Sequence, residues 1–94
     1  NKEQIEDNLS QANSLFREAI DTSKTDPWKA KELFMKSAIH FERIAREGKV
    51  RNGKLFYNIG NTYYHLGDKG RAVLYYEKAL KLMPNDPDLV FNHR

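Results

Sequence analysis

The sequence predicts an all-α protein built from antiparallel helical hairpins. Apolar residues recur every three or four positions through most of the chain, which is the spacing of one face of an α-helix. An aspartate followed by a proline occurs at positions 26–27 and again at 86–87, and this pair is a strong signal for a helix start. Gly48 and Gly67 follow stretches of helical pattern, so they favour helix ends at these points.

Two helices are expected in the first half of the chain. The first covers residues 3–22, and the second covers residues 27–47 and ends near Gly48. The first helix carries its apolar stripe at Ile5, Leu9, Ala12, Phe16 and Ala19. The second carries its stripe at Ala30, Phe34, Ser37, Phe41 and Ile44, and Trp28 lies in its first turn. Each stripe predicts one buried face.

Residues 53–86 contain small residues at positions where two short helices must cross closely. Gly60 lies within one apolar stripe, and Ala72 and Ala79 lie in the next. Missing side-chain volume at these positions allows two helix backbones to approach. Three aromatic residues are expected to fill the space on either side of this crossing: Phe56, Tyr63 and Tyr76.

This segment resembles one tetratricopeptide repeat, a helical hairpin of 34 residues. The likeness rests on Phe56, Ile59, Gly60 and Tyr63 in the first helix, on Gly67 in the turn, on Ala72, Tyr76, Ala79 and Leu80 in the second helix, and on Pro84 after it. A phenylalanine replaces the tryptophan usual in that family, and Gly70 lies early in the second helix. The resemblance implies hairpins stacked as a short right-handed superhelix.

The resemblance organises residues 1–94 as a single domain with about four helices and the start of a fifth. Residues 3–47 are interpreted as a degenerate, elongated hairpin, because Ala12, Phe16 and Ala19 repeat the spacing of the second repeat helix. This hairpin is expected to shield the clearer unit at 53–86. Residues 87–94 begin a further helix. Since the chain also starts without methionine, it is expected to be a piece of a longer protein.

Binding residues are expected on the first helix of the clear unit, which in the resembled family lines the concave groove of the superhelix. If Phe56, Ile59, Gly60 and Tyr63 face the core, the helical period turns a different set outward. That set is Lys54, Tyr57, Asn58, Asn61, Tyr64 and His65. Amides can pair with a peptide backbone, and tyrosines supply contact area with few rotamers to restrict. The alternative is that the asparagines only solvate the helix or bond to neighbouring helices.

One known binding mode of the resembled family does not suit this sequence. Some of these domains clamp the terminal carboxylate of a chaperone tail with asparagines and cations from successive first helices. Asn58 matches one such asparagine, but Asp88 and Asn92 stand where a lysine and an arginine are needed. An internal peptide segment or a partner helix is therefore the expected ligand.

Composition and spacing argue against an enzyme, a cofactor or a metal site. The chain has no cysteine, and its three histidines lack the three- or four-residue spacing of helical zinc ligands. No apolar run approaches the ~20 residues that cross a bilayer. Sixteen basic residues against 13 acidic ones give a net charge of only +3. The densest basic run comprises Arg43, Arg46, Lys49, Arg51 and Lys54. Much of it lies near a predicted helix C-terminus, where the helix dipole favours cations, so the run does not require a nucleic-acid ligand to explain it.

Residues 52–92 are also similar to the repeat segment of bacterial Bat proteins, which are associated with aerotolerance. That family has a G-x-L-Y-Y-N-L-G-N type of first helix, where this chain reads GKLFYNIGN. The resemblance implies an envelope or periplasmic setting with an anchor elsewhere in the protein, although a cytosolic co-chaperone fits the same residues. Three functions stay open: a scaffold that binds a partner protein, a module for self-association, and an RNA-binding helical repeat.

Overall fold

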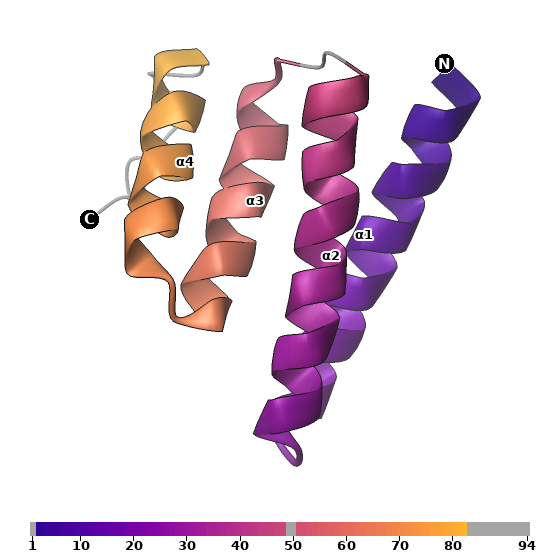
Figure 1. Ribbon diagram of the computed structural model, residues 1–94, viewed down its shortest axis with the longest axis vertical. Coiled ribbons are helices and arrows are strands. Elements are labelled where there is room, and N and C mark those ends of the chain that lie inside the picture. Colours follow the sequence, from indigo (N-terminus) through magenta and orange to yellow (C-terminus); the bar gives the residue numbers. More distant parts are fainter. Residues whose placement is uncertain (1, 49–50, 83–94) are drawn as a thin grey trace. The chain divides into compact units, whose positions relative to one another are not determined.

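The computed structural model describes residues 2–48 and 51–82, and these residues form four α-helices without a strand. The chain divides into two compact units, residues 1–50 and 51–94. The first unit contains α1 (Lys2–Thr22) and α2 (Pro27–Glu47), and the second contains α3 (Gly53–Leu66) and α4 (Lys69–Leu82). Each pair forms an antiparallel hairpin (Figure 1). The predicted all-α class with adjacent helices in pairs is confirmed.

The start of α2 follows the Asp-Pro signal in the sequence. The side chain of Asp26 accepts a hydrogen bond from the Lys29 backbone N–H at 3.1 Å, which satisfies one of the amides that a helix start leaves without a partner. Pro27 occupies the first turn, where its missing N–H costs nothing. The helix ends at Gly48, whose N–H donates to the Ile44 carbonyl at 3.0 Å.

The hairpin of the first unit is closed by small residues and by one buried hydroxyl. Ala12 and Ala19 on α1 are fully buried. Ser37 Oγ on α2 is also buried and donates a hydrogen bond to the Ala12 carbonyl at 2.8 Å. Phe16 and Phe34 meet edge to face, with ring centroids 5.4 Å apart. The stripe predicted for α2 is buried at all five of its positions.

The stripe predicted for α1 is only partly buried, because the buried face is rotated from the predicted one. Ala12 and Ala19 mark the middle of this face, and Leu9 falls at its edge with 38% of its surface exposed. Asn8, on the opposite edge, turns inward instead, and its Oδ1 lies 2.9 Å from His40 Nδ1. The expectation of a buried Leu9 is therefore wrong.

The second unit begins and turns where the sequence predicts. Asn52 caps α3 by accepting a hydrogen bond from the Leu55 N–H at 3.1 Å. Gly67 ends the helix with a φ of 84°, a left-handed conformation that glycine adopts without steric cost. Asp68 then opens α4 by accepting from the Arg71 N–H at 3.1 Å. Its pKa is lowered, first by this backbone hydrogen bond and then by the Arg71 side chain.

The predicted crossing of the two short helices is present at Gly60. A Cβ atom placed on Gly60 would lie 2.6 Å from Tyr76 Cδ1, closer than real Cβ atoms come, and 3.2 Å from the Ala72 carbonyl oxygen, which is a tight contact. Ile59, Ala72 and Ala79 are buried. The glycine therefore makes room for the Tyr76 ring between α3 and α4.

Several predictions lie outside these observations. Pro84, the Asp86–Pro87 helix start and the expected fifth helix fall outside the described residues. The superhelix and the shielding of one hairpin by the other concern the relative placement of the two units, so both stay predictions.

Candidate peptide-binding face

The six residues predicted as a binding set lie on α3, and we call them the α3 face. Lys54, Tyr64 and His65 are exposed, with 57% of Tyr64 accessible to solvent. The other three, Tyr57, Asn58 and Asn61, are half-buried. The buried residues of the same helix are Gly53, Leu55, Phe56, Ile59, Gly60 and Thr62. No member of the α3 face is sealed in the core.

The two asparagines have different surroundings. Asn58 accepts a hydrogen bond through its backbone carbonyl, from Thr62 Oγ1 at 2.8 Å, so this bond does not use its amide side chain. The amide of Asn61 is tied to α4, because the Tyr76 hydroxyl donates to Asn61 Oδ1 at 2.6 Å. Asn61 thus connects the α3 face to the core of the hairpin.

Three tyrosine hydroxyls lie close together on this side of the second unit. The Tyr57 and Tyr76 rings are 5.8 Å apart between centroids. Burial is the main reason that the pKa of Tyr76 is raised to about 12, and the neighbouring Tyr57 and Tyr64 hydroxyls contribute to the same shift. Tyr76 therefore keeps its proton at neutral pH and acts as a hydrogen-bond donor to Asn61.

The ends of the α3 face combine aromatic rings with nitrogen groups. The Lys54 ammonium lies 5.7 Å from the centre of the Tyr57 ring, within the range of a cation–π interaction. The Tyr64 and His65 rings meet edge to face at 5.8 Å. Although His65 is exposed overall, partial desolvation of its ring lowers its pKa, so the ring is neutral at physiological pH. Lys54 is the only cation of the α3 face at this pH.

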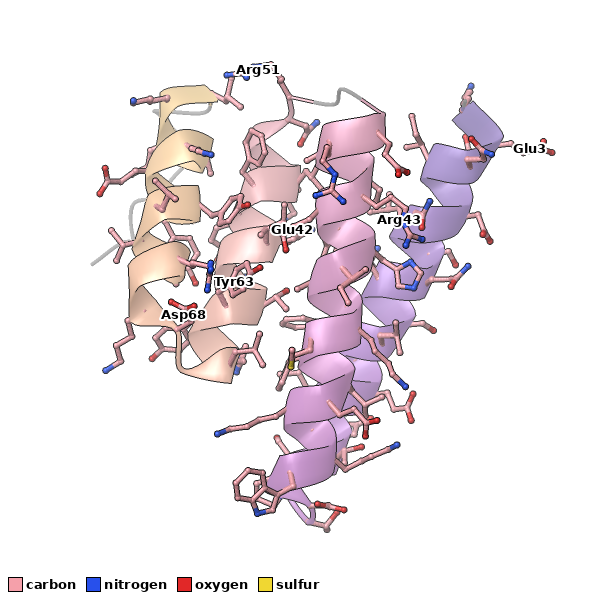
Figure 2. The ribbon with its side chains drawn as sticks, in the orientation of Figure 1. Glu3, Glu42, Arg43, Arg51, Tyr63 and Asp68 are labelled. Atoms are coloured by element: carbon pink, nitrogen blue, oxygen red, sulfur yellow. The ribbon has the colours of Figure 1, made fainter. Side chains whose placement is uncertain are left out.

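A second aromatic cluster, which the sequence analysis missed, lies against other side chains of α3. The Tyr75 ring stacks on the Tyr63 ring, with 5.8 Å between the ring centroids. It also lies beside the Phe56 ring, with 6.2 Å between the centroids. Arg71 lies 5.6 Å from the Tyr63 ring, and Lys78 lies 5.1 Å from the Tyr75 ring. Figure 2 labels Tyr63 on α3 and Asp68 at the turn below it. Each of these rings already packs against side chains of the same unit. The cluster therefore stabilises the hairpin and is not part of the candidate binding face.

The remaining candidates give no chemical site. Within residues 2–48 and 51–82, no three His, Asp or Glu side chains are grouped as metal ligands. None of the four helices is both long and apolar enough to cross a bilayer. Of the basic run, Arg43 lies 4.0 Å from Glu47. Lys49, and the clamp positions Asp88 and Asn92, are outside the described residues.

A cavity of about 400 Å³ lies in the first unit, where the start of α1 separates from the end of α2. Ile5 and Ile44 supply its apolar wall, and Arg43 and Glu47 supply charged groups. Its remaining lining residues are Gln4, Asn8 and Gly48. The cavity contains no member of the α3 face.

The fold and the α3 face define a helical-hairpin protein with a polar, aromatic surface and no recognisable catalytic group in its described part. Residues 53–86 match the tetratricopeptide repeat family model. That repeat is generally a protein–protein interaction module and is typically non-catalytic. Comparisons with curated proteins and with solved structures gave no match.

Proposed function

We propose that the protein is an interaction scaffold that binds an internal peptide segment, or a helix, of a partner protein on the α3 face. The observation that carries the proposal is that a segment similar to the tetratricopeptide repeat exposes a row of tyrosine, amide and basic groups on its first helix. Tyrosine is enriched at protein interfaces, where its ring supplies area and its hydroxyl supplies specificity.

The structure makes Tyr64 the best position for a test. Its side chain is more than half exposed and makes its ring contact with the adjacent His65, so truncation to alanine leaves the core unchanged. Asn61→Ala is a poorer probe, because it removes the acceptor of the Tyr76 hydroxyl and so carries a stability cost of its own. Binding and folding are therefore best separated at position 64.

The test compares Tyr64→Ala with Trp28→Ala as baits in pull-downs from the cells that produce the protein. Trp28 is 81% exposed and belongs to α2 of the first unit, whereas the α3 face belongs to the second unit. Its loss therefore controls for the nonspecific binding of exposed aromatic side chains. We expect Tyr64→Ala to lose partners that wild type and Trp28→Ala retain, at unchanged thermal midpoints. Retention of every partner by Tyr64→Ala would contradict the proposal.

Self-association is the second candidate, and one observation favours it. Trp28, Met35 and Ile39 are exposed on α2, and their spacing places them on one stripe of that helix. An exposed apolar stripe of this kind is typical of contacts between subunits. Sedimentation of the 94-residue chain at rising concentration tests this function, and a monomer throughout would exclude it.

The similarity of residues 52–92 to bacterial Bat proteins supports an envelope setting for this scaffold. A reading frame that continues into a membrane anchor would agree with this setting. A frame that continues into a cytosolic chaperone-binding domain would contradict it.

A further inference from the structure

A hydrogen bond joins Tyr76 on α4 to Asn61 on α3. Tyr76 comes from α4, and its ring occupies the space beside Gly60 where a Cβ would otherwise lie. From there its hydroxyl reaches Asn61 Oδ1 at 2.6 Å. Gly60 and Asn61 are neighbours in sequence, so the small residue lets a buried tyrosine reach the amide that follows it.

This bond determines which end of the Asn61 amide is available to a ligand. A phenol has one proton, and at neutral pH Tyr76 keeps it. The amide oxygen accepts a hydrogen bond from this hydroxyl, so it is the oxygen, and not the nitrogen, of the amide that Tyr76 engages. The Nδ2 group makes no hydrogen bond among the described residues, and its two N–H donors are presented by the half-buried side chain. Asn61 thus has its two N–H donors available to a bound segment.

The charge distribution points the same way. Helix α3 contains no aspartate or glutamate. Residues 51–82 contain six lysine and arginine residues against two acidic ones, and one of these, Asp68, is paired with Arg71 at 2.7 Å. Residues 2–48 contain eight basic residues against nine acidic ones. The positive excess of the described chain therefore belongs to the unit that carries the α3 face.

We infer that the α3 face selects an acidic internal peptide segment, and that Tyr76 is a positioning residue that holds the Asn61 amide so that its N–H donors meet a carboxylate or carbonyl oxygen of that segment. This inference rests on the proposed function. A donor aimed at an anion in a positively charged setting makes a stronger hydrogen bond than a neutral pair, and the field of the unit favours the encounter.

Fluorescence anisotropy with the 94-residue chain tests the inference. The probe is a short labelled peptide that repeats glutamate, serine and leucine, with both termini blocked so that no terminal carboxylate takes part. Its control has glutamine in place of each glutamate. We expect the glutamate peptide to bind at least about tenfold more tightly in low salt, and the difference to shrink as screening increases.

Three variants separate the positioning role from a structural one. Asn61→Asp keeps an acceptor for Tyr76 but replaces the N–H donors with an acidic oxygen, so we expect unchanged stability and loss of most affinity for the glutamate peptide. Tyr76→Phe keeps the ring and frees the amide, and should weaken that peptide about two- to tenfold while affecting the glutamine peptide less. Tyr75→Phe, a hydroxyl deletion in the other aromatic cluster, should change neither affinity.

Each remaining outcome overturns the inference. Equal binding of the two peptides, or none of either, would refute selection of an acidic segment, whereas the pull-down with Tyr64→Ala decides the proposed function independently. Full affinity in Asn61→Asp would show that the donors are not used. Tighter binding of a uridine oligonucleotide than of the glutamate peptide would replace the peptide with single-stranded RNA.

Discussion

Replacing Gly60 by alanine tests the close crossing of α3 and α4, on which the second unit depends. The new methyl group would lie 2.6 and 2.7 Å from two Tyr76 ring carbons and 3.2 Å from the Ala72 carbonyl oxygen. The Tyr76 ring is only 7% exposed and is held at its far end by Asn61, so it cannot move aside freely. The helices must separate instead.

The expected magnitude is the difference between two opposing effects. Overpacking of a well-packed core costs about 1–3 kcal/mol, and alanine is favoured over glycine within a helix by about 1 kcal/mol. Because the contacts at Gly60 are with a confined ring and with backbone, we expect the upper part of the packing range. The free energy of unfolding should therefore fall by about 1–2 kcal/mol, or roughly 4–15 °C in thermal midpoint for a domain of this size.

Urea denaturation followed by circular dichroism provides the measurement, with Gly70→Ala as the matched control. A Cβ on Gly70 would meet only Asp68 Oδ1, at 3.9 Å, so this variant isolates helix propensity and should gain about 0.5–1 kcal/mol. Opposite signs for the two glycine-to-alanine changes support the crossing. If Gly60→Ala were as stable as Gly70→Ala, the reasoning about the crossing would be refuted.

Three further predictions concern other single contacts. Gly67→Ala should destabilise the second unit by about 1 kcal/mol, because a left-handed φ strains a residue with a Cβ, and Gly67→Asn should cost less; equal urea midpoints for wild type and Gly67→Ala would show that the turn relaxes. Ser37→Ala should cost about 1 kcal/mol through the lost bond to the Ala12 carbonyl, and hydrogen exchange should show the loss in the α1–α2 hairpin alone. The depressed pKa of Asp68 contributes stability above its ordinary value of 3.8 that is lost as pH falls through the lower folded-state pKa. A pH series with Asp68→Asn should therefore converge with wild type in acid, and a constant difference down to pH 2 would contradict it.

Local signals were sufficient for most of the fold. The Asp-Pro pair predicted the start of α2, and Gly67 predicted the end of α3. The helical period of α2 predicted which of its stripe residues are buried. These predictions succeed because caps and periodicity depend on residues that are close in the chain. Leu9 shows the limit of the same reasoning. Its spacing fits the stripe of α1, but the partner helix covers a face centred on Ala12 and Ala19, and no spacing within α1 reports that rotation.

The candidate site divides in the same way. The six residues of the α3 face follow from the period of one helix and the resemblance of residues 53–86 to a known repeat. The stack of Tyr75 on Tyr63 does not follow, because it joins side chains of two helices. The sequence pattern placed Tyr76 at the crossing, where its ring lies beside Gly60, but it gave no partner for the neighbouring Tyr75, which contacts Phe56 and Tyr63.

The sequence alone determined that this chain forms α-helical hairpins and that one helix of its repeat-like segment presents tyrosines, amides and basic groups, since backbone caps and the helical period act over a few residues. Only the tertiary structure decided that the Tyr76 hydroxyl, from α4, donates a hydrogen bond to the Asn61 oxygen on α3. The physical reason is that a hydrogen bond between residues 15 positions apart depends on the separation of two packed helices, which the missing side chain of Gly60 permits.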